Sequence, residues 1–142
     1  MSLYLDASVL IPTIVMEQTS ATVFEFLLAR ADDLTVSDFA VAEVAAGLSR
    51  LVRMGRLDAT DAADRLADFD DWRAGMTATV DVAAPDCRLA STYVRRFDLM
   101  LRAPDALHAA ICRRLDFSLV TLDRRLASAT RELGLDVRVP DA

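Results

Sequence analysis

Short runs of apolar residues alternate along the chain with longer segments in which apolar residues recur every three or four positions. The short runs are typical of strands and the longer segments are typical of helices. Their regular alternation favours an α/β fold with a parallel central sheet flanked by helices. The predicted strands span residues 3–6, 34–36, 79–82, 117–122 and 135–139.

The predicted helices lie between these strands, and several of them begin or end at residues suited to that position. Ser37 and Asp38 offer N-terminal caps. Pro104 suits a first helical turn, and Gly134 suits the residue after a helix. The helix that follows Ser37 has apolar residues on several sides, which predicts that it is buried centrally. The predicted helices span residues 9–16, a segment beginning at 19 or 20, 38–52, 57–72, 85–96, 104–115 and 123–133.

The length and composition favour a single globular domain that spans residues 1–142. The hydrophobic fraction is 54%, and only 4 glycines and 4 prolines occur, which argues against disorder. No apolar run is long enough to cross a membrane, and the first residues lack the positive charge of a secretory signal. We therefore expect a cytoplasmic protein.

The charged residues exclude several classes of enzyme. All 16 basic residues are arginine, so a phosphate-binding P-loop and a Schiff-base mechanism are excluded because both need a lysine. Cys87 and Cys112 lack the spacing of zinc or redox motifs. The net charge of −6 opposes binding of a nucleic acid unless carboxylates gather divalent cations, which reverse the local sign.

Acidic residues with a hydroxyl nearby mark the ends of two predicted strands. Asp6 and Ser8 follow the first strand, and Thr121 and Asp123 end the fourth. Ligands of parallel sheets bind beyond the carboxyl ends of the strands, so these four side chains are candidates for one site. The alternative for Asp6 is that it only caps the next helix.

Two further acids lie on predicted helices. Glu43 has apolar or small neighbours one turn away on either side, and a buried carboxylate needs a cation, a proton or a charged partner. Its alternative is a place on a narrow exposed strip. Asp105 follows Pro104 in a first helical turn, where the helix dipole alone favours an acid.

Four converging carboxylates would require cations because their charges repel one another. Oxygen ligands select hard cations such as Mg²⁺. Such a site suits phosphodiester hydrolysis, in which the metal activates water, holds the phosphate and neutralises the leaving oxygen.

Four segments together resemble the PIN-domain nucleases, and more closely the VapC-type toxins of bacterial toxin-antitoxin pairs. LYLDASVLIP looks like the first motif of the family, VSDFAVAEVAAGL the second, APDALHAAIC the third and LVTLDRRLA the fourth. The resemblance assigns the acidic metal ligands and catalytic residues to Asp6, Glu43, Asp105 and Asp123, and the supporting hydroxyls to Ser8 and Thr121.

The resemblance also implies the architecture and the activity. We expect a PIN-like three-layer α/β/α sandwich around a parallel sheet of about five strands. We expect an endoribonuclease that depends on Mg²⁺, for which Mn²⁺ substitutes, and that acts as the toxin of a toxin-antitoxin pair. The implied partners are the RNA substrate, a VapB-like antitoxin and a second copy of the chain in a homodimer.

Other interpretations are weaker or remain open. A phosphorelay receiver needs a lysine, and a haloacid-dehalogenase-like phosphatase needs an aspartate where this chain has Ser8. A non-catalytic PIN-like module that binds RNA or protein is the main alternative. His108 is left out of catalysis, since a packed or hydrogen-bonded histidine explains its position. Several arginines could contact solvent, RNA or a partner, and the sequence does not distinguish these roles. They are the stripe of Arg50, Arg53 and Arg56 and the pairs at 95–96, 113–114 and 124–125.

Overall fold

Five parallel strands form the centre of the molecule, in the order β3-β2-β1-β4-β5. The structure, a computed structural model, describes residues 2–141. The expected parallel sheet of about five strands is confirmed. The strands are β1 (Leu3–Leu5), β2 (Leu34–Ser37), β3 (Ala78–Val80), β4 (Ser118–Val120) and β5 (Val137–Arg138).

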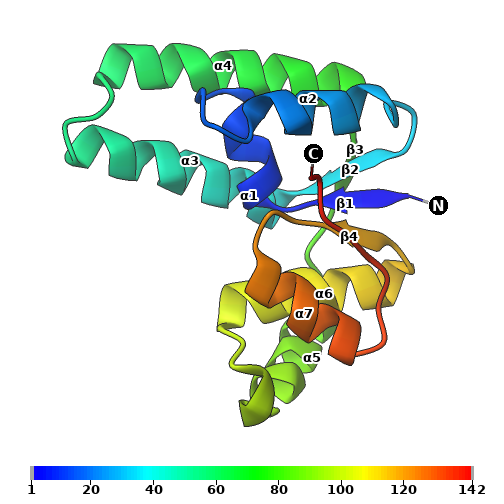
Figure 1. Ribbon diagram of the computed structural model, residues 1–142. Helices are drawn as coiled ribbons and strands as arrows, with labels where there is room; N and C mark the ends of the chain where they lie inside the picture. Colours follow the sequence, from blue (N-terminus) through cyan, green and yellow to red (C-terminus); the bar gives the residue numbers. More distant parts are fainter. Residues whose placement is uncertain (1, 142) are drawn as a thin grey trace.

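Helices cover both faces of the sheet and complete three layers (Figure 1). None of the helices within residues 2–141 combines the length and the apolar character needed to cross a membrane. The helices are α1 (Ala7–Leu10), α2 (Ser20–Leu28), α3 (Asp38–Arg53), α4 (Ala59–Met76), α5 (Ala84–Val94), α6 (Ala103–Leu115) and α7 (Arg124–Glu132), with 3₁₀ turns at Ile11–Thr13 and Phe97–Leu99.

The alternation of side chains along β1 separates two hydrophobic cores. Leu3 and Leu5 point into the core formed with α1, α2, α3 and α4. Tyr4 points to the opposite face, into the core formed with α5, α6 and α7. A short strand that is buried on both faces reads as continuously apolar, which is why the parallel sheet was predictable.

The chain leaves β1 toward β2 on one side, whereas β4 pairs with β1 on the other side. Leu5 of β1 lies opposite Val120 of β4, so Asp6 and Thr121 follow two adjacent strand ends. The backbone N–H of Asp6 donates to the Val120 carbonyl at 3.2 Å and extends this pairing. In open parallel sheets such a switch point forms the usual crevice for ligands.

The first predicted helix, residues 9–16, is replaced by the short helix α1 and a 3₁₀ turn. The Thr13 hydroxyl donates to the Leu10 carbonyl at 2.6 Å, and the Ser20 hydroxyl donates to the Pro12 carbonyl at 2.7 Å. These hydroxyls occupy carbonyls that a continuing helix would use, and so the helix ends early.

The prediction that the helix after Ser37 is buried centrally is wrong. Only Ala40, Val44 and Leu48 of α3 are fully buried, and they form a single stripe toward the core. The remaining apolar residues are half-buried or exposed because α3 packs chiefly against α1, α4 and β2, which within residues 2–141 leaves its outer side open. The cap was predicted correctly, since the Ser37 hydroxyl accepts from the Ala40 N–H at 3.0 Å.

Candidate active site

Asp6 lies at the carboxyl end of β1 within a set of hydroxyl groups. Its carboxylate accepts hydrogen bonds from the Ser8 hydroxyl at 2.5 Å and from the Thr121 hydroxyl at 2.6 Å. It also accepts from the Val9 N–H at 3.3 Å and thereby caps α1. The two interpretations of Asp6 from the sequence are therefore compatible, since the residue caps a helix and also joins the two strand ends.

The Asp6 carboxyl is almost fully buried, with 4% of its surface exposed. Burial raises its pKa above the ordinary value, and the hydrogen bonds from Ser8 and Thr121 offset part of this effect. The charged form of Asp6 is thus costly without a cation nearby.

Asp123 is connected to this set through Thr121. The Thr121 hydroxyl accepts from the Asp123 N–H at 3.0 Å and donates to Asp6. The Asp123 carboxylate caps α7 by accepting from the N–H groups of Arg125 and Leu126, at 3.0 and 3.1 Å. Asp123 itself is exposed, so its carboxylate stays open to solvent and ligands.

Asp105 lies in the first turn of α6, as the sequence predicted, and is half-buried. Burial raises its pKa, and the negative charge of Asp123 raises it further. Glu43 contributes in the same direction. The negative charges of Asp123 and Glu43 therefore both act on the Asp105 carboxyl.

Glu43 is half-buried, with 29% of its side chain exposed, and its carboxylate pairs with Nε2 of His108. Glu43 thus lies between the two interpretations from the sequence, since its carboxylate is partly exposed and also has a partner. A carboxylate only accepts hydrogen bonds, so Nε2 of His108 must carry the proton. This contact fixes the direction in which Glu43 points.

His108 is in turn held by residues of the sheet. It is 2% exposed, and its Nδ1 lies 2.6 Å from the Tyr4 hydroxyl, which lies 2.6 Å from the Ser37 hydroxyl. Burial raises the pKa of Tyr4, so this hydroxyl stays protonated. His108 is thus hydrogen-bonded, as its position suggested, but the sequence analysis missed Tyr4. The available signal was alternation, which places Tyr4 on the same side of β1 as Asp6.

Three of the four predicted acids, Glu43, Asp105 and Asp123, line one pocket of about 400 Å³. Arg102 and Arg125 line it as well. Asp6 is connected to this pocket through Thr121 and is not part of its lining. Within residues 2–141, no three acidic, histidine or cysteine side chains stand close enough to form a ready-made set of metal ligands. The carboxylates surround a space instead of closing on one point.

Residues 3–132 match the model of the PIN domain family. The chain therefore belongs to the PIN domain family, and the resemblance found in its four motifs is confirmed. A comparison with curated protein sequences finds no significant match.

Solved structures with the same fold include toxin complexes. VapBC2 from Rickettsia felis bound to a DNA fragment from their promoter is 15% identical, with a TM-score of 0.73, and the match covers 99% of this chain and 100% of that chain. VapC20 from Mycobacterium tuberculosis, a toxin that cleaves the sarcin-ricin loop, is 17% identical, with a TM-score of 0.73 and coverage of 90% and 95%. A toxin-antitoxin complex from Klebsiella pneumoniae is 15% identical, with a TM-score of 0.61 and coverage of 87% of each chain. At these identities the likeness is one of fold.

Proposed function

We propose that this PIN-domain protein is a metal-dependent endoribonuclease that acts as the toxin of a toxin-antitoxin pair. The observation that carries the proposal is the pocket beyond the strand ends that Glu43, Asp105 and Asp123 line together. Acids gathered in this way suit hydrolysis of a phosphodiester, and the sarcin-ricin loop cleaved by VapC20 is a precedent on the same fold.

The donor set suits Mg²⁺ or Mn²⁺. The lining acids supply only oxygen, which hard cations prefer, and Mg²⁺ keeps several waters and needs few carboxylates. An open pocket fits such an ion better than a closed cage would. Glu43, Asp105 and Asp123 would hold the ion, with Asp6 near them. The bound ion would supply an activated water and neutralise charge on the phosphate.

The chain's own residues would orient the reaction. His108 holds one oxygen of Glu43, a residue that lines the pocket, and leaves the second oxygen for the ion. Ser8 and Thr121 hold Asp6 in one orientation from two sides. Arg102 and Arg125 place positive charge beside the acids, where a phosphate oxygen could accept from a guanidinium.

Cleavage of RNA is expected to require a divalent cation. A labelled RNA incubated with the purified chain should be cut with Mg²⁺ or Mn²⁺ and remain intact in excess EDTA. Isothermal titration with Mn²⁺ should show binding that the Asp105→Asn variant weakens. Full activity in EDTA would contradict the mechanism, and the absence of both cleavage and metal binding would favour a non-catalytic binding module.

Replacing His108 is expected to lower the turnover number while KM for RNA stays unchanged, because His108 positions Glu43 and does not face substrate. We expect His108→Ala to lower kcat about 10- to 100-fold, the usual cost of removing a group that orients a metal ligand. Tyr4→Phe keeps the ring beside His108 and should lower kcat less. Rates are compared per folded molecule, determined by circular dichroism. An unchanged kcat in His108→Ala would show that Glu43 needs no such support.

We also propose a VapB-like antitoxin as the inhibitory partner. A pocket lined by three carboxylates favours a cationic side chain, so an arginine of the partner could enter it and displace the metal. Inhibition would then weaken as the Mn²⁺ concentration rises. The family resemblance further suggests a homodimer of the chain, which light scattering of the purified protein measures.

An apolar groove between α2 and α4 is the proposed binding surface for an antitoxin helix. It has a volume of about 230 Å³, and its lining includes Phe24, Leu28 and Trp72. Leu28 is 78% exposed, Phe24 39% and Met76 45%, and all three line this groove, so they form a contiguous apolar patch of the kind that marks interaction sites. Leu27 also lines this groove, whereas Leu51 of α3 does not.

A further inference from the structure

The structure divides the arginines into those that hold the fold together and those that do not. Arg114 pairs with the buried Asp86 at 2.7 Å, and Arg113 donates to the Leu133 carbonyl at 2.7 Å. Arg96 pairs with Asp98 at 2.9 Å. These contacts account for the pair at 113–114 and for one member of the pair at 95–96.

A second group of arginines lines a groove between α2 and the α7–β5 edge of the molecule. Arg30, Arg124, Arg131 and Arg138 share this groove, whose volume is about 720 Å³. Within residues 2–141, Arg30, Arg124 and Arg131 form no ion pair. We call this surface the arginine groove. Two acidic residues, Glu25 and Asp141, also line the groove, and Arg138 pairs with Asp136 at 3.3 Å, so the arginines still outnumber the nearby acids in a chain whose net charge is −6.

Two of these guanidinium groups, those of Arg30 and Arg131, are already held in place. Arg30 stacks over the Phe26 ring, 4.1 Å from its centre, and donates to the Phe26 carbonyl at 3.3 Å. Arg131 donates to the Val137 carbonyl at 3.4 Å. Less conformational entropy is lost when a ligand binds to side chains that are ordered beforehand.

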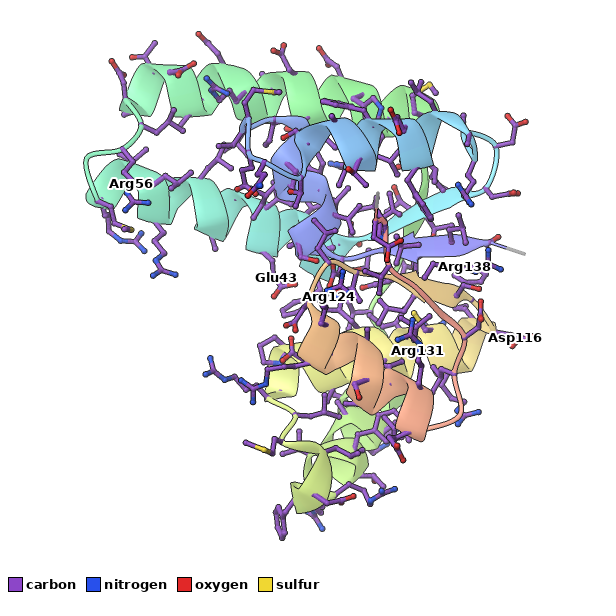
Figure 2. The ribbon with its side chains drawn as sticks, in the orientation of Figure 1. Glu43, Arg56, Asp116, Arg124, Arg131 and Arg138 are labelled. Atoms are coloured by element: carbon purple, nitrogen blue, oxygen red, sulfur yellow. The ribbon has the colours of Figure 1, made fainter. Side chains whose placement is uncertain are left out.

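Helix α7 connects the arginine groove with the acidic pocket, because Asp123 and Arg125 line the pocket whereas Arg124 and Arg131 line the groove. Arg124 directly follows Asp123, and Arg131 lies two turns further along the same face, about 10 Å away along the helix axis. In the orientation of Figure 2, Arg124 is drawn between Glu43 and Arg131. A ligand with repeated negative charges could therefore extend from the acids over three arginines.

We propose that the arginine groove binds the phosphate backbone of the RNA strand on one side of the scissile bond. This inference rests on the proposed nuclease function and adds the path of the substrate. The proposal explains how a chain of net negative charge could bind RNA, because positive side chains gather along the proposed path of the RNA. Contacts to phosphate give affinity without reading the base sequence.

The test uses the Arg131→Gln/Arg138→Gln double variant, which leaves the two arginines beside Asp123 unchanged. Its matched control is Arg53→Gln/Arg56→Gln, two exposed residues that line neither the acidic pocket nor the arginine groove. Arg53 ends α3, and Figure 2 shows Arg56 just beyond it, far from Glu43. Binding of a labelled single-stranded RNA is measured by anisotropy over a range of KCl concentrations, with Ca²⁺ in place of Mg²⁺. Cleavage of the same RNA and of a dinucleotide is measured in Mg²⁺.

The double variant should bind the RNA about tenfold or more weakly, and the slope of log Kd against log salt should fall by about 1.4, because each lost contact with a single strand contributes about 0.7. Cleavage of the dinucleotide and all properties of the control should stay unchanged. An unchanged Kd and slope would overturn the proposal. It would equally be overturned if only inhibition by an antitoxin were lost, since the groove would then bind protein. If the wild type cleaves no RNA, the proposed function fails, while the binding data still decide whether the groove holds RNA.

Discussion

Replacing Asp6 with asparagine is expected to reduce RNA cleavage by about 1,000-fold while the protein stays folded. Loss of one carboxylate near a catalytic cation removes several kcal/mol of transition-state stabilisation, and about 4 kcal/mol corresponds to this factor. The rate is measured with labelled RNA at saturating Mg²⁺. A residual rate within tenfold of the wild type would remove Asp6 from the catalytic set.

The stability of this variant without metal distinguishes a catalytic role from a structural one. Because burial raises the folded-state pKa of Asp6, its charge destabilises the fold at pH values above the unfolded-state pKa. Asparagine removes that cost but loses one acceptor for Ser8 or Thr121, so the two effects oppose each other. We expect a metal-free Tm within about 5 °C of the wild type. A much larger decrease would mean that Asp6 mainly holds the strand ends together.

Asp86 provides the matched control, because it is a buried acid in the first turn of α5 that does not line the acidic pocket. Burial acts to raise its pKa, yet hydrogen bonds from Arg114 and from the Ala83 N–H hold the pKa below the ordinary value. Its charge therefore stabilises the fold above the unfolded-state pKa, and this stability is lost as the pH falls through the folded-state pKa. Asp86→Asn should lower stability by about 2 kcal/mol and leave cleavage per folded molecule unchanged.

The strand ends were predictable because their signals are local. An apolar run followed by an acid and then a hydroxyl predicted that Asp6 and Ser8 lie at the end of β1, as the structure shows. An apolar run followed by a hydroxyl and then an acid did the same for Thr121 and Asp123 at the end of β4. Parallel strands then bring such ends together at one edge of the sheet. The pairing of β1 with β4, which joins the two sets, came only from the structure.

The surroundings of Glu43 were not predictable, because they depend on what covers a helix and not on its own sequence. The pattern of α3 is equally compatible with burial on all sides and with one open side. The partner of Glu43 is His108, 65 positions away, and the support of His108 comes from Tyr4, 104 positions away. Neither contact leaves a periodic signal in the sequence.

The roles of the arginines were also not predictable from the sequence. The three pairs look alike in the sequence, yet Arg114 binds a buried acid whereas Arg124 and Arg125 border the acidic pocket and its adjoining groove. The difference arises from position relative to the sheet. Charge counts along the chain could not reveal it, since the net charge of −6 averages over acidic and basic surfaces.

Replacing Leu28 with aspartate is expected to release the protein from its antitoxin while leaving RNA cleavage intact. Leu28 is exposed on α2 and lines the apolar groove, so the substitution should not disturb the core. An amphipathic helix lying in the groove would bury the new carboxylate without a partner, and this cost should weaken binding about 100-fold. The measurement is the Kd between the chain and the product of its neighbouring gene, followed by cleavage of RNA in the complex over a range of Mn²⁺ concentrations.

Met54→Asp serves as the matched control, because Met54 is a large apolar residue, 49% exposed, that lies outside the groove at the end of α3. This variant should bind the antitoxin and be inhibited as the wild type is. If Leu28→Asp binds as tightly as the wild type, the groove does not hold the partner. If no neighbouring gene product binds the wild type, or a bound one leaves cleavage unchanged at every Mn²⁺ concentration, the toxin role is wrong and a free-standing PIN nuclease remains. Loss of inhibition in Leu28→Asp with full cleavage would instead assign separate surfaces to catalysis and to control.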